Sequence, residues 1–400
     1  MNHLQHLRDR LQSAVQRKRL LDTAIQLISV PSRTGEGGAV ADRLADILGG
    51  DGFRVERPVS DHPAAPAVVV RLDSGKPGPT LEFNGHLDTV HLPFVPPRVE
   101  GDRLTGSGSA DMKAGVAAAV EALRVLRDLG LPHAGSILFV AHDLHEAPWG
   151  DNRQLDRLIR DGVVGNAVLI PEYMTDRVAV IGRGALTWKA TLRRPGQPIH
   201  EVMRPPEEPS VIAAGAELVA RIQHLAEHLA AKSDPLAGAE SVFIGQIHSG
   251  EIYNQYPQEC FVQGTRRWLP GTRREDVELS LNALFQSVSK DTGTSVNAEI
   301  TFIRDAFLLD RNLPFVELFE TVHEAVSGTR LPFGPKPFCD DGNTFWTLAG
   351  IPTITHGPQA GGAHTLQEWV SIDDLCRVAL VYALTAASYC APGTLAPTIG

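Results

Sequence analysis

The sequence predicts an α/β protein in which a mostly parallel sheet carries helices on both faces and a ferredoxin-like α+β domain is inserted. Strand-like and helix-like segments alternate through residues 1–184, and the pattern changes over residues 185–303. Alternation then returns from Asp305 to about Pro392. At 400 residues the chain is long for one core, so two domains are expected.

The first domain is predicted from buried-strand patterns and helix end signals. The short apolar runs at 136–141 and 167–170 are typical of strands covered on both faces. The Ala- and Leu-rich segment 113–129 ends at Gly130 and Pro132, as helices do. The expected elements are strands at 67–71, 80–83, 136–141 and 167–170, and helices at 5–29, 35–48, 113–129 and 152–161.

The second domain is predicted from a different order of elements. Its expected strands are 185–194, 240–248, 259–268 and 295–303, with helices at 210–232 and 275–288. The order strand–helix–strand–strand–helix–strand is that of a ferredoxin-like unit. We therefore expect one discontinuous domain at 1–184 and 304–400, and an inserted one at 185–303.

Composition excludes several classes of partner. The net charge of −10 makes nucleic acid or an anionic membrane a poor match. No apolar run approaches the roughly 18 residues that span a bilayer. The N-terminal segment lacks the features of a signal peptide, and the four cysteines form no CxxC pair. These features predict a cytoplasmic protein that acts on a small molecule.

Five separated segments carry residue types that bind metals. They are Gly85–Asp88, Ala110–Lys113, His145-Glu146, Pro171-Glu172 and Gly362–His364. Three of them follow predicted strands, and ligands of open α/β sheets gather at the carboxyl ends of strands. The pattern predicts a site in which two divalent metals share a carboxylate.

The individual residues suit different tasks in such a site. His86 and Asp88 are two residues apart in extended chain and so face the same way; one can bind a metal while the other orients it. Asp111 begins a predicted helix, where aspartate is a common cap. Alternatively it bridges two metals about 3.5–4 Å apart.

The chain resembles the M20 family of di-metal peptidases and deacylases, which includes aminoacylase, acetylornithine deacetylase, succinyl-diaminopimelate desuccinylase and glutamate-releasing carboxypeptidase. The motifs that carry the resemblance are Asn84–Val90, the Gly106–Gly115 segment with Asp111-Met112-Lys113, and Gly357 through His364 to Glu368. The resemblance implies a metal-binding catalytic domain and, at 185–303, a lid through which two copies form a homodimer.

The resemblance also implies roles for single residues. His86 and Glu172 would hold the first metal, Asp111 would bridge with a cis peptide bond after it, and Glu146 and His364 would hold the second metal. Asp88 would support His86. The metals would be Zn²⁺, with Mn²⁺ or Co²⁺ as alternatives, because the set contains no thiolate.

Three residues of the lid match substrate-binding positions of the family. They are His200, Asn254 and Arg267. The resemblance implies that His200 stabilises an oxyanion, in some relatives across a dimer interface. Arg267 suits a substrate carboxylate because its planar fork bonds both oxygens, and Asn254 would help to hold the same group.

One segment departs from the family pattern. Where relatives have Asp-Glu-Glu, with the first glutamate as general base, this chain has Leu144-His145-Glu146. His145 can itself accept the proton from the attacking water. Alternatively Glu146 is the base, Asp143 or His142 enters the ligand set, and the second metal is altered or absent. The departure also allows loss of activity.

These features predict a hydrolase that cleaves the amide C–N bond of an N-acyl amino acid or small peptide with a metal-activated water. Asp88, His145 and Glu146 are the candidate catalytic residues. One alternative keeps the metals but hydrolyses another C–N bond, such as that of an activated aryl amine. The other is a non-catalytic binding protein on the same scaffold.

Overall fold

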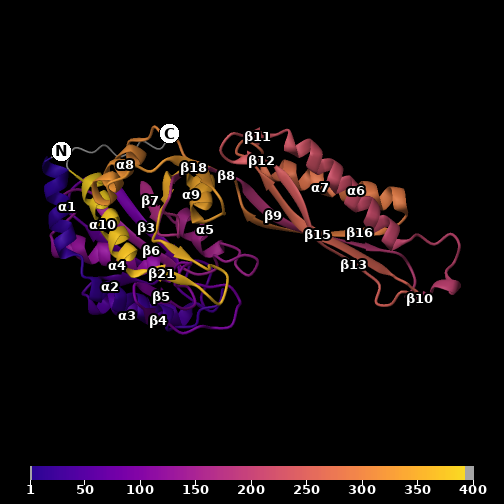
Figure 1. Cartoon of the computed structure of the whole chain (residues 1–400), viewed down its shortest axis with the longest axis horizontal. Helices are drawn as coiled ribbons and strands as arrows, with labels where there is room; N and C mark the ends of the chain where they lie inside the picture. Colours follow the sequence, from indigo (N-terminus) through magenta and orange to yellow (C-terminus); the bar gives the residue numbers. More distant parts are fainter. Residues whose placement is uncertain (1, 392–400) are drawn as a thin grey trace. The chain divides into compact units, whose positions relative to one another are not determined.

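The computed structural model describes residues 2–391, and its contacts divide the chain into two compact units (Figure 1). Unit 1 contains the chain up to Val180, Leu309–Gly334 and the residues from Asp340 onward; unit 2 contains Ile181–Leu308 and Pro335–Cys339. The expected insertion at 185–303 falls inside unit 2. Met1 and residues 392–400, which the expected first domain includes, lie outside the described residues.

Unit 1 is built on a six-stranded, mostly parallel sheet. Its order is β1 (Val55–Glu56), β2 (Val68–Asp73), β6 (Ser136–His142), β3 (Thr80–His86), β7 (Ala167–Ile170) and β19 (Thr353–Thr355). The pairs β6–β3, β3–β7 and β7–β19 are parallel, whereas β1–β2 and β2–β6 are antiparallel. Four neighbouring strands, β6, β3, β7 and β19, are therefore parallel and end at one edge.

Helices cover both faces of this sheet, as predicted. Tyr382 packs on Phe83 of β3, with ring centroids 5.1 Å apart, while Leu158 packs against Leu138 and Val140 of β6. Phe83 pairs with Phe139, which faces opposite to Leu138 because strand side chains alternate. The helices of unit 1 are α1 (Asn2–Ala14), α2 (Arg17–Ile28), α3 (Gly38–Gly50), α4 (Lys113–Asp128), α5 (Arg153–Arg160), α8 (Pro314–Ser327), α9 (Asp341–Ala349) and α10 (Ile372–Tyr389).

The prediction of a single helix at 5–29 is wrong, because the chain forms two helices there, α1 and α2. At the break, the backbone N–H of Gln16 donates to Oε1 of Glu121 on α4, at 2.8 Å. Arg19, on the next turn, forms an ion pair with the same carboxylate at 2.8 Å. A buried carboxylate thus takes the N–H that a continuous helix would use.

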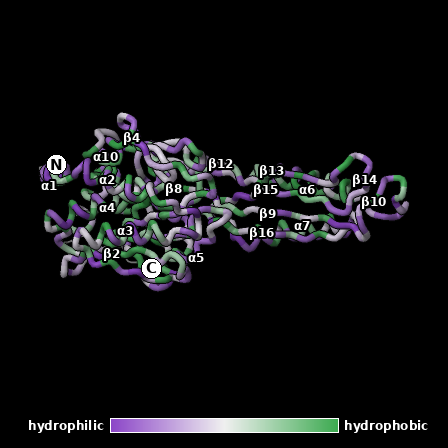
Figure 2. The backbone as a smooth tube through the Cα atoms, turned by 90° about the horizontal axis from the view of Figure 1, so that it is seen from below, coloured by the Kyte–Doolittle hydropathy of each residue, from purple (hydrophilic) through white to green (hydrophobic). Residues whose placement is uncertain are grey.

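Unit 2 contains the expected strand and helix order. Its main elements are β9 (Gly184–Arg193), α6 (Val211–Ala230), β13 (Ser241–Ser249), β15 (Glu259–Trp268), α7 (Arg274–Thr292) and β16 (Ser295–Arg304). The antiparallel sheet has the order β13-β15-β9-β16. Figure 2 shows hydrophobic and hydrophilic residues interleaved along these strands, as expected for a sheet covered by helices on one face.

Short strands complete the two units. They are β4 (Arg98–Glu100), β5 (Arg103–Thr105), β8 (Val178–Gly182), β10 (Ile199–His200), β11 (Ser233–Asp234), β12 (Gly238–Ala239), β14 (Gln255–Tyr256), β17 (Phe307–Leu308), β18 (Phe333–Lys336), β20 (Ala360–Gly361) and β21 (Trp369–Ser371), with a 3₁₀ turn at Glu201–Met203. Within residues 2–391, no helix combines the length and apolar character required to cross a bilayer.

The core of unit 2 predicts a stability difference between two leucines of α7. Leu281 is 1 % exposed, whereas Leu279 is 66 % exposed. We expect Leu281→Ala to cost about 2–5 kcal/mol of unfolding free energy, because it leaves a cavity in the core. Leu279→Ala is the matched control and should change stability by less than about 0.5 kcal/mol. Urea denaturation of both variants, followed by circular dichroism, measures the difference; equal losses would contradict this packing.

Candidate metal centre

The strand ends of unit 1 bring the predicted ligands to one edge of the sheet. Asp88 follows β3, His145-Glu146 follows β6, and Glu172 follows β7, while His86 is the last residue of β3. All five are buried. The remaining two predicted ligands come from elsewhere in unit 1: Asp111 from the residues just before α4, and the half-exposed His364 from the segment between β20 and β21.

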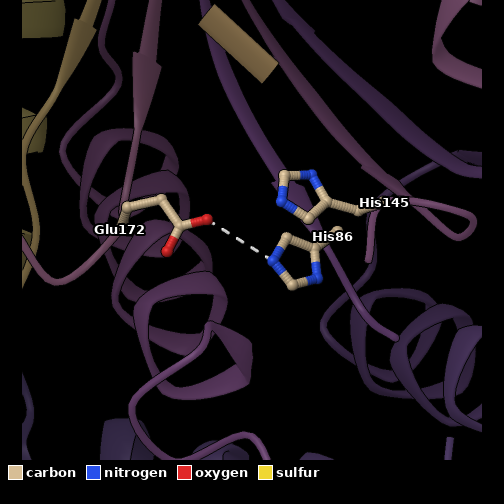
Figure 3. A group of neighbouring side chains, drawn as sticks. All are labelled: His86, His145 and Glu172. Carbon is tan, nitrogen blue, oxygen red and sulfur yellow. Dashed lines mark ion pairs between the residues drawn. The ribbon is translucent and has the colours of Figure 1, made fainter. Parts of the chain in front are cut away.

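His86 presents one ring nitrogen to two carboxylates. Its Nδ1 lies 3.0 Å from the backbone carbonyl oxygen of Asp88, which can only accept, so Nδ1 is the donor in the neutral ring. Its Nε2 lies 3.0 Å from Oδ1 of Asp111 and 3.4 Å from Oε1 of Glu172. Figure 3 shows the Glu172 carboxylate directed at this imidazole. The arrangement fixes Nε2 as the ligand atom.

Asp111 faces a second group of ligands with its other oxygen. Oδ2 of Asp111 lies 3.2 Å from Nε2 of His364, and the same nitrogen lies 3.2 Å from Oε2 of Glu146. The two oxygens of one carboxylate are therefore directed at two imidazoles from different parts of the chain. This is the geometry that a bridging ligand between two cations requires.

The electrostatics of the cluster favour added positive charge. Burial opposes ionisation of Asp111, yet His364 and His86 hold its pKa far below the ordinary value. Hydrogen bonds to Asp111 and Glu146 raise the pKa of His364 to about 10. Burial, followed by the charge of Asp111, raises the pKa of Glu172 well above its usual value. Protons thus offset part of the negative charge that these carboxylates concentrate.

The residues fit divalent metals. Among the described residues, no group hydrogen-bonds the buried Oε2 of Glu172. Two sets of side chains hold ligand atoms close enough to share an ion, namely His86 with Asp111 and Glu146, and His86 with His145 and Glu172. Nitrogen and oxygen ligands without a thiolate suit zinc, manganese or cobalt.

His145 is oriented by an aspartate that sequence reasoning missed. Its Nδ1 lies 2.8 Å from Oδ1 of Asp341, and its ring stacks on His86 with centroids 3.9 Å apart and planes 5° apart. Figure 3 shows the two parallel rings. His142 reaches the other oxygen of Asp341, at 3.1 Å. The sequence offers one signal for Asp341, the pair Asp340-Asp341 at the start of a helix, and this pattern indicates a helix cap. Asp340 is that cap.

Asp88 does more than support His86. Its carboxylate accepts hydrogen bonds from the backbone N–H groups of His145, at 3.1 Å, and Glu146, at 3.0 Å. Burial opposes its charge, but His86 and His145 lower its pKa to about 2. Asp88 therefore fixes the turn after β6 as well as the imidazole beside it.

Glu368 fixes the loop that carries Asp111. Its Oε2 accepts from the backbone N–H groups of Gly108 and Ala110, each at 3.1 Å, and of Asp111, at 3.4 Å. Burial, followed by the charge of Asp111, raises the pKa of Glu368 to about 7. The cis peptide bond that the family resemblance implied after Asp111 is present. Lys113 is buried and donates to Ser32 and a backbone carbonyl, so it serves the structure of this region.

Two glycines allow the backbone at Glu172 to be enclosed. A Cβ atom on Gly115 of α4 would lie 2.1 Å from the carbonyl oxygen of Pro171. A Cβ atom on Gly357 would lie 2.2 Å from the carbonyl oxygen of Glu172. Both contacts are shorter than any carbon can make, so only glycine lets α4 and the segment after β19 approach this ligand.

The three substrate-binding candidates lie in unit 2 and separate into two places. Nε2 of His200 lies 3.2 Å from Nδ2 of Asn254, close to the start of β15. Arg267 lies near the end of β15, eight residues after Glu259 and therefore about 26 Å along the strand. One chain's Asn254 and Arg267 thus cannot hold the same carboxylate. Among the described residues, no carboxylate is within ion-pair distance of Arg267, whose guanidinium lies 4.0 Å from Sγ of Cys339.

Comparison with known proteins identifies the family. The sequence pattern of peptidase family M20/M25/M40 matches residues 83–388, a range that includes every ligand named above. The chain belongs to this family. It is therefore a hydrolytic enzyme, and metal-dependent amide hydrolysis is the chemistry that the family and the named relatives support.

Relatives of this M20 enzyme agree along nearly the whole chain. A succinyl-diaminopimelate desuccinylase of Methylobacterium sp. (strain 4-46) is 27 % identical over 383 residues, which are 89 % of this chain and 92 % of the relative. A tripeptidase of Staphylococcus aureus subsp. aureus mu50 is 21 % identical, with a TM-score of 0.79 over 94 % of this chain and 99 % of its own.

A further solved structure resembles the fold of this chain, and its description mentions metal binding. A Bacillus subtilis protein described as a dinuclear metal-binding peptidase from the M20 family has a TM-score of 0.67 and 13 % identity, covering 94 % of this chain and 98 % of its own. At this identity the likeness is one of fold. The support for metal binding by this chain comes from its own two candidate ligand sets, which share His86.

The charges of the M20 site predict that metal binding releases protons. Without metal, His364 is protonated at pH 7 because its pKa is about 10. A ligating imidazole must be neutral, so the proton leaves when the metal binds. Each proton that the metal displaces should lower the affinity for the second metal about tenfold for every pH unit below 10. Titration calorimetry in buffers of different ionisation enthalpy measures this release; binding heats that are independent of the buffer would contradict it.

Proposed function

We propose that this M20 enzyme uses two divalent metals to hydrolyse the amide bond of an N-acyl amino acid or small peptide. Zn²⁺ is the metal that we expect, with Mn²⁺ or Co²⁺ as alternatives. His86, Asp111 and Glu172 would hold one metal, and Asp111, Glu146 and His364 the other. The observation that carries the proposal is Asp111, whose two oxygens face His86 at 3.0 Å and His364 at 3.2 Å. Bound metals would supply a water of lowered pKa and polarise the substrate carbonyl.

The chain's own proton acceptor in this proposal is His145. Asp341 on Nδ1 makes that nitrogen the donor, so Nε2 is the basic nitrogen of the neutral ring. Glu146 is engaged with His364 and serves better as a ligand than as the base. His145 would take a proton from the attacking water and pass it to the leaving amine, while Asp341 keeps the ring in one orientation.

A competing role for His145 is that of a metal ligand. Its ring stacks on His86, and ligand atoms of His86, His145 and Glu172 lie close enough together to hold one ion. The two roles differ in what the loss of the ring does. A ligand's removal lowers metal content, whereas a base's removal lowers turnover alone.

The substrate carboxylate is proposed to bind Arg267, which has no ion-pair partner among the described residues and can offer a bidentate fork. His200 and Asn254 contact each other at a separate place in unit 2. If they act on substrate, they act on a different part of it or in the site of a partner subunit.

We also propose a homodimer through unit 2, located in the cytoplasm. In the described part of the chain, β13 pairs only with β15 and so leaves an open edge, which carries Phe243 at 64 % and Ile247 at 53 % exposure. An open edge with apolar side chains is a ready partner for a second strand. The four cysteines are free thiols, as a reducing compartment requires.

The proposed activity can be tested on purified enzyme depleted with chelator and reconstituted with Zn²⁺, Mn²⁺ or Co²⁺. We expect release of free amino acid from N-acyl amino acids or dipeptides, lost on depletion and restored by metal. Elemental analysis should find two metals per chain. Release of ammonia from an aryl amine, with no cleavage of any amide, would refute the proposal in favour of a different C–N bond.

His145→Ala should lower kcat by about 10²–10⁴-fold with two metals retained, because only the proton acceptor is lost. Asp341→Asn should lower kcat less, because the ring keeps its place but loses the carboxylate that orients it. The measurements are steady-state kinetics against pH and metal content by elemental analysis. Loss of one metal in His145→Ala would assign His145 as a ligand instead, and unchanged turnover would remove it from the mechanism.

Phe243→Lys should convert the dimer to a monomer, because it places a charge on the open edge of β13. Leu279→Lys, which alters an equally exposed leucine on α7, is the matched control and should leave the dimer intact. Light scattering after size-exclusion chromatography gives the mass of each variant. A monomeric unmodified protein would contradict the proposed assembly.

A further inference from the structure

Two aromatic side chains beside the metal centre have no part in the proposed chemistry. The rings of His91 and Trp149 stack in parallel, with centroids 4.4 Å apart and planes 7° apart. Both belong to unit 1, and they come from different segments: His91 follows β3, and Trp149 follows β6. The pair joins the segment that carries Asp88 to the segment that carries Glu146.

The chain itself keeps this pair near the reacting atoms. His91 is three residues after Asp88, and Trp149 is three residues after Glu146. Three residues of extended chain reach at most about 11 Å. Asp88 and Glu146 are directly joined, because the Asp88 carboxylate accepts the N–H of Glu146 at 3.0 Å. The α-carbons of His91 and Trp149 therefore lie within about 11 Å of those of Asp88 and Glu146.

The pair is anchored from one side and open on the other. Nε2 of His91 lies 3.1 Å from the backbone oxygen of Thr34, which holds the imidazole in place. The backbone N–H of Gly150 donates to the carbonyl of Glu146 at 2.7 Å, which ties down the turn that carries Trp149. Even so, Trp149 keeps 45 % of its surface exposed.

This exposure sets Trp149 apart from the other tryptophans. Trp188 and Trp268 are almost fully buried in the core of unit 2, and Trp346 and Trp369 are partly buried. Packing does not explain why a large apolar ring is held in place yet left open at the edge of a catalytic site. A fixed, exposed indole offers a flat surface to a second flat group.

We propose that Trp149, backed by His91, is a stacking subsite for a planar aromatic group of the substrate. The inference rests on the proposed amide hydrolysis and narrows its substrate class to amides that carry an aryl group, either on the acyl side or on the amino acid side. An aliphatic acyl group gains no ring contact there. Trp149 is thus a specificity-determining residue, and His91 is a positioning residue that holds the indole.

Matched substrates test the subsite through kcat/KM of the metal-loaded enzyme. One pair compares N-benzoylalanine with N-acetylalanine, and a second compares N-acetylphenylalanine with N-acetylalanine, so the arms separate an aryl acyl group from an aryl side chain. Trp149→Ala should lower kcat/KM about tenfold for the aryl member of one pair and less than twofold for N-acetylalanine. Trp149→Phe should retain most of the preference, and His91→Ala should lose part of it.

A control variant addresses the surrounding loop. Phe94 is 39 % exposed and lies three residues after His91, but it is not part of the stacked pair. Phe94→Ala should leave the aryl preference unchanged. An equal loss in Phe94→Ala, or a loss in Trp149→Ala that is the same for aryl and acetyl substrates, would overturn the assignment.

A binding measurement separates this inference from the proposed function. Acrylamide quenching of tryptophan fluorescence reports Trp149 as the difference between the unmodified enzyme and Trp149→Phe. Benzoate or phenylalanine should protect this component, and acetate or alanine should not. Protection without hydrolysis of any amide would refute the proposed function but keep the subsite; hydrolysis of amides without protection and without aryl preference would refute the subsite alone.

Discussion

The structure of the site depends on the concentration of buried carboxylates around His86. Asp88, Glu146 and Glu172 lie at one edge of a sheet, and Asp111 joins them from the segment before α4. Burial makes every unpaired charge among them costly. The protein offsets this cost in two ways. Although burial opposes charge on His86, hydrogen bonds to Asp111 raise the pKa of His86 and of His364, so these imidazoles carry protons. Burial, together with the charge of Asp111, raises the pKa of Glu172 and so opposes its ionisation. Divalent cations, held by the same residues, would perform this task with two charges each. The affinity expected of the site for metal and the electrostatic cost of burying its carboxylates therefore have the same origin.

The parallel strands and the family motifs made much of this site predictable. The ligand-bearing ends of β3, β6 and β7 meet because parallel neighbours end together, and that follows from the order of buried runs in the sequence. The bridging role predicted for Asp111 rested on the pattern of five segments and on the family resemblance, since a helix-start aspartate alone indicates a cap. Its geometry, with one oxygen toward each imidazole, agrees with that role.

What could not be predicted rests on contacts between distant segments. Asp341 reaches His145 across 196 positions, and Glu368 reaches the backbone before Asp111 across more than 250. Neither contact leaves a local pattern, because an aspartate in a first helical turn and a glutamate in a loop are common for other reasons. The break between α1 and α2 was missed for the same reason: the group that causes it, Glu121, lies on another helix.

The boundary between the units also has a consequence for engineering. A simple insertion leaves its host once and returns once, but here Pro335–Cys339 belongs to unit 2 as well, so the chain passes between the units four times. A chimera that takes only the continuous stretch 181–308 from a donor would not receive the donor's counterpart of the five residues Pro335–Cys339. Recombination among relatives, in nature or the laboratory, must therefore carry this short second segment along, or select compensating changes where the transplanted sheet meets it.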